Sequence, residues 1–341
     1  MKIIILHDQL PDDARSDEAD ALVQAQAVSA ALRELGHEAS IVPVSLDLQT
    51  LADHLRADAP DLVFNLVESL GGHGRLIHFV PGLLDALRIP FTGAPAEAQF
   101  ATSNKLFAKR ILQTAQLRTP AWYSMDDLVG EAAIVPGQYI VKSLWEHASV
   151  GLDEDSVLFA EAAWQLREAV DARADQLGGE GFAEQFIDGR EFNIGLLADE
   201  FGPQVLPPAE IMFEGYGRDK PRIVGYRAKW AEDSYEYNHT PRRFDFPRQD
   251  AALIEELSSI ALECWKLFGL RGYARVDFRI DQEQRPLVLE INTNPCLSPD
   301  AGFAAALEEA NIPFARAIGR IIHDALRPTA RRVGMADVQS S

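Results

Sequence analysis

Four polar residues on two neighbouring predicted strands form the pattern with the clearest chemical meaning in this sequence. Arg275 and Asp277 alternate with apolar residues, and so do Glu290 and Asn292. The polar segment 281–285 between them predicts a turn, so the strands pair as a hairpin. Because side chains alternate between the two faces of a strand, each pair shares one face. In a symmetric register Asp277 faces Glu290, and Arg275 faces Asn292.

Two carboxylates that face each other destabilise a sheet unless something neutralises them. A divalent cation between Asp277 and Glu290 would remove the repulsion, and the amide oxygen of Asn292 would complete an oxygen-only set. Such a set suits Mg²⁺, with water and substrate phosphate as further ligands, and Mn²⁺ is an alternative ion. The intervening Val276, Phe278, Leu289 and Ile291 predict that the opposite face belongs to the core. A solvated sheet face is the alternative interpretation.

The composition limits the kinds of partner that the chain can have. It has 341 residues, 47% of them hydrophobic, and a formal net charge of -20. This length predicts two or three packed subdomains. A surface so negative repels phosphate backbones and anionic lipid, so we expect no nucleic-acid or membrane partner. The N-terminal apolar run is too short for a signal peptide, and no run reaches membrane-spanning length, which predicts a cytoplasmic protein.

The elements that must position the hairpin begin with strands that alternate with helices. Strands are predicted at 3–6, 39–44 and 61–66, and helices at 17–35, 47–56 and 76–87. This alternation predicts a parallel sheet, whose ligands lie at the carboxyl ends of its strands. Glu68 follows the third strand at that edge.

The remaining chain mixes the two kinds of element differently. Helices are predicted at 103–115, 158–174 and 251–268, strands at 139–143, 181–187, 191–197, 272–280 and 286–293, and further helices up to 326. The predicted fold class is mixed α/β and α+β. An N-terminal parallel α/β domain spans 1–95, and two α+β subdomains span 96–180 and 181–327. We expect the tail 328–341 to be disordered.

With these elements in place, the motifs resemble those of D-alanine–D-alanine ligases in the ATP-grasp superfamily. The strands Arg275-Val276-Asp277 and Glu290-Ile291-Asn292-Thr293-Asn294-Pro295 resemble the metal-binding strands of that family. Upstream, in the family's order, lie Asn104-Lys105, Ile140-Val141-Lys142, His147-Ala148-Ser149-Val150-Gly151, Ala183-Glu184-Gln185-Phe186-Ile187-Asp188-Gly189-Arg190-Glu191 and Arg227-Ala228-Lys229-Trp230. The ordered set spans most of the chain and is specific, although each motif alone is not.

The resemblance implies that the two later subdomains sandwich ATP, and it implies a role for each matching residue. Lys105 and Lys142 would neutralise the phosphates, and the loop around Ser149 would cover them. Three side chains would pack on adenine: Ile140, Phe186 and Leu289. Glu184 would accept a hydrogen bond from the adenine amino group, and the backbone of Gln185, Phe186 and Ile187 would bind the edge of the ring. Glu191 would bind ribose. Asp277, Glu290 and Asn292 would hold two Mg²⁺ ions, Arg275 would stabilise the tetrahedral intermediate, and Lys229 would be a further active-site lysine.

The chain departs from the family pattern mainly where substrates would bind. The region after His7-Asp8 lacks the family's segment for the first amino group, and Cys296-Leu297-Ser298-Pro299-Asp300 replaces its Gly- and Ser-containing loop. The phosphate loop has His147 and Ala148 where the family has Gly and Ser. We therefore expect retained ATP chemistry and altered substrate pockets. Glu68 would hold a substrate ammonium group and Arg75 a carboxylate, with Asp17 and Glu18 of less importance.

The expected activity is an ATP-dependent carboxylate–amine ligase that joins amino acids or small peptides. The substrate carboxylate would attack the γ-phosphate to give an acyl phosphate, and an amine would then expel phosphate. ATP and these small molecules are the expected partners, and the sequence leaves a homodimer open. Two alternatives remain: a ligase that tailors a specialised metabolite or peptide, and an ATP-binding module or ATPase without ligation. Cys296 as a nucleophile is a further hypothesis, although no matching His is visible in the sequence.

Overall fold

The computed structural model describes residues 1–11, 14–130, 132–146, 149–217 and 219–327. His147 and Ala148 of the predicted phosphate loop lie outside the described residues, and so does the predicted tail. Three sheets organise the chain: one parallel and two antiparallel. None of the described helices combines the length and the apolar character needed to cross a lipid bilayer.

The N-terminal sheet is parallel, as the alternation of strands and helices predicted. It contains β1 (Lys2–Asp8), β2 (Glu38–Val44) and β3 (Leu62–Asn65) in the order β2-β1-β3. The central strand β1 is apolar throughout its middle, and Ile3, Ile4, Ile5 and Leu6 are fully buried because helices cover both faces. The covering helices are α1 (Ser16–Glu34), α2 (Leu48–Asp58) and α3 (Phe79–Leu87). The helix predicted from residue 76 begins later, because residues Gly74–Leu76 form a 3₁₀ turn.

Two short helices lead out of this domain, where the sequence predicted one. They are α4 (Ala96–Ser103) and α5 (Lys105–Thr114). Asn104 separates them because its backbone is extended, and its side chain accepts a hydrogen bond from the N–H of Phe107 at 2.8 Å. Asn is a preferred N-cap residue, so a new helix begins at Lys105 with a fixed direction.

The central antiparallel sheet has the order β4-β7-β5-β6. Its strands are β4 (Trp122–Tyr123), β5 (Gly137–Ser143), β6 (Val157–Ala160) and β7 (Gly181–Gln185), and α6 (Ala163–Ala172) packs on it. The helix predicted from residue 158 is wrong in its first part, because Leu158 pairs with Tyr139 of β5. Strand β7 pairs with β4 and β5, so it lies in the central sheet although the predicted boundary falls before it.

The C-terminal sheet has the order β11-β10-β8-β12-β13, with β9 on the side of β8. Its strands are β8 (Glu191–Asp199), β9 (Gly202–Val205), β10 (Ala209–Ile211), β11 (Arg242–Arg243), β12 (Tyr273–Ile280) and β13 (Pro286–Asn292). The helices of this part are α7 (Tyr226–Trp230), α8 (Tyr235–Asn238), α9 (Ala251–Leu267), α10 (Gly302–Glu309) and α11 (Phe314–Leu326). The sequence did not predict β9, β10, β11, α7 or α8, which are too short for a periodic pattern.

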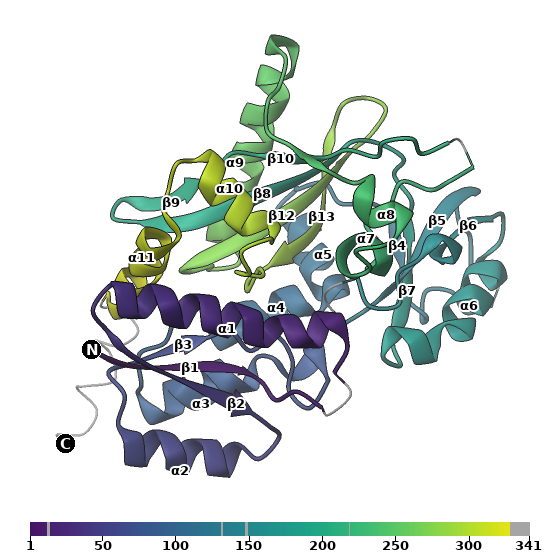
Figure 1. Cartoon of the computed structure of the whole chain (residues 1–341). Helices are drawn as coiled ribbons and strands as arrows, with labels where there is room; N and C mark the ends of the chain where they lie inside the picture. Colours follow the sequence, from purple (N-terminus) through teal and green to yellow (C-terminus); the bar gives the residue numbers. More distant parts are fainter. Residues whose placement is uncertain (12–13, 131, 147–148, 218, 328–341) are drawn as a thin grey trace.

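Alternation along β8 and β12 assigns their faces to two different cores. Ile194 and Val276 pack with α9, whereas Leu197 and Tyr273 pack with α1, α10 and α11. Helix α1 therefore lies between the parallel sheet and the C-terminal sheet, and the central subdomain stands beside them (Figure 1). The face of β12 that carries Tyr273 also carries Arg275 and Asp277.

Candidate active site

The hairpin of β12 and β13 places its polar side chains as the sequence predicted. Arg275 pairs with Asn292, and Asp277 pairs with Glu290. Their shared face is partly open, while Val276 and Ile291 on the opposite face are 0% and 1% exposed. The prediction that the second face of this hairpin belongs to a core is therefore confirmed for Val276 and Ile291, which pack with residues of α9.

The register is not symmetric, and this corrects the expectation from alternation that Leu289 belongs to the core face of the hairpin. Next to the turn Phe278 pairs with Val288, but the following pair is Asp277 with Glu290, so a bulge leaves Leu289 unpaired. A bulge re-aims the side chain of its extra residue. Leu289 consequently lines the same cavity as Glu290 and is absent from the core that contains Val288 and Ile291.

Arg275 neutralises Asp277 within this face. Its guanidinium makes two bonds to the carboxylate, Nε to Oδ1 at 2.8 Å and the terminal nitrogen to Oδ2 at 2.9 Å. Asn193 of β8 also donates to Asp277 Oδ1, at 2.8 Å. Burial alone would lower the pKa of Arg275, but Asp277 and Glu290 raise it. The repulsion between Asp277 and Glu290 is therefore relieved partly by the protein itself, in a forked geometry that lysine could not reproduce.

Three lysines gather opposite the hairpin around one buried carboxylate. Lys142 of β5 lies 2.6 Å from Glu184 Oε1, and Lys109 of α5 forms an ion pair with Oε2. Lys105, one turn before Lys109, donates to the carbonyl of Glu146 at 2.7 Å. Burial lowers the pKa of Lys105. This cluster supplies the local positive field that an anionic ligand requires on a chain with a strongly negative total charge.

The strand end 185–187 has one backbone donor left for a ligand. The N–H of Gln185 donates to Ala121 O at 2.7 Å, and the N–H of Phe186 donates to Gln138 O at 2.9 Å. Among the described residues, the N–H of Ile187 has no backbone acceptor. The predicted contact of this segment with an adenine edge is therefore restricted to the Ile187 N–H and to the carbonyl groups.

Arg279 fixes the segment that follows and was missed by the sequence reasoning. It is 4% exposed and donates to Gly189 O at 3.0 Å and to Glu191 Oε2 at 2.5 Å. These bonds tie the predicted ribose residue to β12. The alternation of β12 could have revealed Arg279, because it shares a face with Arg275 and Asp277.

Ser149 of the predicted phosphate loop contacts a second segment, which connects β10 and β11. Its φ is 61°, in the left-handed region, and its hydroxyl donates to Val224 O at 2.8 Å. The N–H of Tyr226 donates to Leu152 O at 2.9 Å in the same contact. The predicted phosphate loop is thus joined to residues of the C-terminal subdomain.

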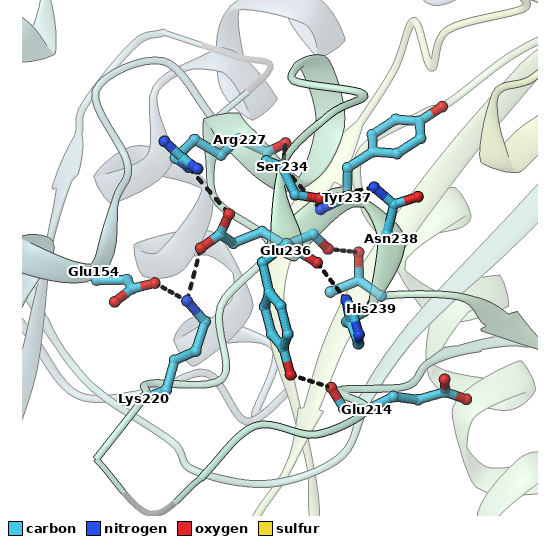
Figure 2. Close-up of polar contacts among 11 residues, drawn as sticks. Glu154, Glu214, Lys220, Arg227, Ser234, Glu236, Tyr237, Asn238 and His239 are labelled. Atoms are coloured by element: carbon cyan, nitrogen blue, oxygen red, sulfur yellow. Dashed lines mark hydrogen bonds and ion pairs between the residues drawn. The ribbon is translucent and has the colours of Figure 1, made fainter.

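That second segment is a flap, defined here as residues 212–217 and 219–240, which leaves β10 and returns to β11. Figure 2 shows Lys220 between Glu154 and Glu236, with Arg227 on the other oxygen of Glu236. Burial raises the pKa of Glu236, but Lys220 and Arg227 bring it down to about 2. Glu236 therefore stays charged over the physiological pH range, and its ion pairs with Lys220 and Arg227 persist there. The Tyr226 hydroxyl donates to Asp17 at 2.8 Å, so the flap also contacts α1.

The end of the cavity near α1 is acidic, and neutral groups bind the carboxylates of Glu68 and Asp20. Gln24 donates to Glu68 Oε1 at 2.9 Å. Burial raises the pKa of Glu68 to about 7, and Asp8 and Asp20 raise it further against the effect of Gln24. Asp20 accepts from the thiol of Cys296 at 2.9 Å and from the hydroxyl of Ser298 at 2.5 Å.

One expectation about this end needs correction. Arg75 does not line the cavity: its side chain is 54% exposed and lies 3.8 Å from Glu180. Asp17 does line it, although it was expected to matter less than Glu68. Asp17 and Asp20 come from α1, and no local pattern indicated that this helix faces the hairpin.

A single cavity of about 430 Å³ collects the predicted site residues other than Arg75. They are Glu68, Lys105, Ile140, Lys142, Ser149, Glu184, Gln185, Phe186, Ile187, Glu191, Lys229, Arg275, Asp277, Leu289, Glu290 and Asn292. Among the described residues, no group of three or more His, Cys, Asp or Glu side chains could hold a metal ion. The predicted Mg²⁺ ligands form a different set, two carboxylates and one amide, and its oxygen-only chemistry fits Mg²⁺.

Comparisons with known proteins agree with this arrangement. The family model described as D-ala D-ala ligase C-terminus matches residues 124–323. The D-alanine--D-alanine ligase of Aquifex aeolicus is 29% identical over 333 residues, 94% of this chain and 100% of that protein. The D-alanine--D-alanine ligase of Gloeobacter violaceus is 31% identical over 314 residues, 90% of this chain and 94% of that protein.

Solved structures share the fold. The D-alanine--D-alanine ligase from Bacillus anthracis superposes with a TM-score of 0.70 at 20% identity, covering 96% of this chain and 98% of that one. The same ligase complexed with ATP gives a TM-score of 0.68 at 19% identity. The predicted ATP-grasp fold class is confirmed. The two alternatives that the sequence left open, a tailoring ligase and a module without ligation, are not favoured.

Proposed function

Because this chain belongs to the D-alanine–D-alanine ligase family and is an ATP-dependent carbon–nitrogen ligase, we propose that it joins two amino acids in the cavity between its three sheets. The supporting observation is that one cavity holds a lysine cluster at one end, an acidic pocket at the other and Arg275 between carboxylates on the hairpin. D-alanine, which the names of its relatives contain, is the first substrate to test at both positions.

The nucleotide would bind between the central and C-terminal sheets. Ile140, Phe186 and Leu289 would contact adenine, Glu184 and the Ile187 N–H would bond its edge, and Glu191 would bind ribose. Lys105, Lys142 and the backbone around Ser149 would neutralise and cover the phosphates. Asp277, Glu290 and Asn292 would hold Mg²⁺, which supplies charge neutralisation to the phosphates when bound.

At the other end the chain's own residues would orient the two amino acids. Ionised Glu68 would accept from a substrate ammonium group, while Arg275 and Lys229 would attract the oxygens that become negative when an amine attacks the acyl carbon. The flap would exclude water, which otherwise hydrolyses an acyl phosphate. Its contacts with Ser149, Glu154 and Asp17 support this role because they reach the other two parts of the chain.

Two measurements test the proposal. Millimolar Mg-ATP is expected to raise the melting temperature, because a ligand of the native state stabilises it by mass action. Phosphate release from ATP is expected to require an amino acid, with the product identified by mass among D-alanine, other amino acids and dipeptides. Release of phosphate that no added amine changes would contradict ligation, and an unchanged melting temperature would contradict ATP binding.

A further inference from the structure

A buried charge cluster lies behind the nucleotide end of the cavity. Glu184 is 1% exposed, and each of its carboxylate oxygens contacts a different lysine. Lys142 contacts Oε1 and lines the cavity, whereas Lys109 contacts Oε2 and does not line it. Lys109 is itself 1% exposed and donates to the hydroxyl of Thr119 at 2.6 Å. One lysine thus faces the ligand space, and the other belongs to the interior.

Two lysines of helix α5, Lys105 and Lys109, have different surroundings. Lys105 and Lys109 are four residues apart, so they lie on the same face of the helix one turn from each other. Lys105 reaches the cavity wall, while Lys109 reaches β7 beneath it. The next residue, Arg110, is exposed and lies over the Trp122 ring at 5.5 Å from its centre. The helix therefore offers a matched exposed cation beside the buried one.

We propose that Lys109 is a positioning residue that makes the site selective for a 6-amino purine by holding Glu184; this rests on the proposed ATP site. Lys109 keeps Oε2, with or without nucleotide. Oε1 is shared: Lys142 occupies it in the free protein and moves to the phosphates when ATP binds. The released oxygen then accepts a hydrogen bond from the adenine amino group. A 6-oxo purine has no hydrogen at that position and places an oxygen against the carboxylate.

The charges of the cluster explain why the second lysine is needed. With Lys142 alone, Glu184 would form a neutral pair, and the departure of Lys142 would leave a buried carboxylate without a partner, which is strongly unfavourable. With Lys109 present, the departure of Lys142 leaves an ion pair intact. Glu290 also acts on Lys109, and Glu290, Lys142, Glu146 and Glu184 act on the neighbouring Lys105.

The ionisation of Glu184 depends on the same contact. Burial alone would raise the pKa of Glu184, but Lys109 and then Lys142 lower it. Both lysines therefore favour the ionised, hydrogen-bond-accepting form of Glu184. Loss of Lys109 removes the larger of the two opposing effects, so the remaining burial raises the pKa of Glu184.

The test compares ATP with inosine triphosphate, which differs at the 6-position, in the amine-dependent phosphate-release assay. Lys109→Met is expected to lower the ATP to inosine triphosphate ratio of kcat/KM by about ten- to a hundredfold, the range for a hydrogen bond to a charged group. The loss should lie mainly in the KM of ATP. Lys109→Arg, which keeps the buried charge, should restore most of the ratio. Arg110→Met, the matched exposed control, should leave it unchanged.

A pH series separates positioning from a general loss of structure. In Lys109→Met the ratio should fall further as the pH is lowered, because Glu184 takes up a proton more readily without Lys109, whereas the wild-type ratio should stay level over the same series. A wild-type ratio in Lys109→Met, or equal changes in Lys109→Met and Arg110→Met, overturns the inference. Should Lys109→Met not melt cooperatively, Lys109→Gln provides the same loss of charge with polar packing. Absence of ATP-dependent phosphate release in the wild type contradicts the proposed function instead.

Discussion

The two ends of the cavity hold their carboxylates in different ways. At the nucleotide end Glu184 is paired with Lys109 and Lys142, so its pKa is lowered in spite of burial. At the substrate end the Gln24 amide donates a hydrogen bond to Glu68, and burial raises the pKa of Glu68 to about 7 although Gln24 and Arg275 oppose the rise. The first carboxylate is fixed in its charged form by the protein. The second is only partly ionised near neutral pH, and a bound cation would favour its charged form.

This difference indicates which end is complete before substrates bind. The lysines at the nucleotide end are preorganised for a ligand that carries several negative charges, and the carboxylate among them is already compensated. The substrate end has an excess of acid that a substrate ammonium group would compensate. Binding of the amino substrate should therefore depend on pH near neutrality, while binding of ATP should not.

The hairpin of β12 and β13 joins the nucleotide end of the cavity to the substrate end. A substitution in this hairpin is expected to have the largest effect on turnover. Glu290→Gln should reduce turnover by about a hundred- to a thousandfold, the range for one preorganised charged group at a reacting centre. The melting temperature should not fall, because the substitution keeps the shape and removes one of two facing charges. Glu283→Gln is the matched control, since Glu283 lies on the turn of the same hairpin with 65% of its side chain exposed. Wild-type turnover in Glu290→Gln would show that the hairpin does not hold the metal and phosphates.

A second change should affect the rate and leave nucleotide binding alone. Arg275→Lys keeps the charge but cannot make both bonds to Asp277. We expect kcat to fall about a hundredfold with a change of roughly twofold or less in the KM of ATP. Steady-state kinetics at saturating amino substrate measure both. Equal losses in the two constants would place Arg275 in ground-state binding at the nucleotide end.

The nucleotide end was more accessible to prediction than the substrate end, for a physical reason. Lys105, Lys142 and Glu184 lie in short motifs whose strand or helix could be assigned from local alternation and capping. Their convergence followed from the resemblance and the order of the motifs. Lys109 was missed because a lone lysine inside a helical pattern is usually exposed.

The substrate end depends on contacts between distant segments, which no local pattern encodes. Asp20 comes from α1 and Cys296 from the loop after β13, and they meet only because α1 packs between two sheets. The sequence therefore suggested Arg75, which is close to Glu68 along the chain, and that prediction was wrong. Leu289 was misplaced for a different reason, since a one-residue bulge reverses the face that simple alternation predicts.

A third change tests the substrate end directly. Glu68→Gln should raise the KM of the amino substrate by about ten- to a hundredfold, the range for a hydrogen bond to a charged group, with little effect on the KM of ATP. In the wild type this KM should fall as the pH rises through about 7, because Glu68 becomes ionised. In Glu68→Gln it should be level over the same range. An effect confined to the KM of ATP would place the ammonium group elsewhere.

The raised pKa of Glu68 also predicts an effect of pH on the stability of the fold. The ordinary value is 4.5 and the folded value is about 7, so between these the folded state holds the proton more tightly than the unfolded chain. Stability attributed to Glu68 is therefore present below about pH 4.5 and is lost as the pH rises through 7. At about 1.4 kcal/mol for each unit of difference between the folded and unfolded pKa values, the full loss should be roughly 3 kcal/mol. Chemical denaturation at several pH values should show a shallower decline in Glu68→Gln, and parallel declines would contradict the assignment.

The smallest effect is expected at Cys296, which tests whether the substrate end contains a nucleophile. Burial raises the pKa of the Cys296 thiol well above its usual range, and Asp20 and Glu68 raise it further. The thiol donates to Asp20 at 2.9 Å, so it acts as a neutral donor beside a carboxylate. A reactive cysteine requires the opposite surroundings, because the thiolate is the nucleophile. Cys296→Ser keeps a donor of similar size, and its kcat/KM should stay within about threefold of the wild type. A loss of about a thousandfold, together with a covalent adduct detected by mass spectrometry, would restore the nucleophile hypothesis.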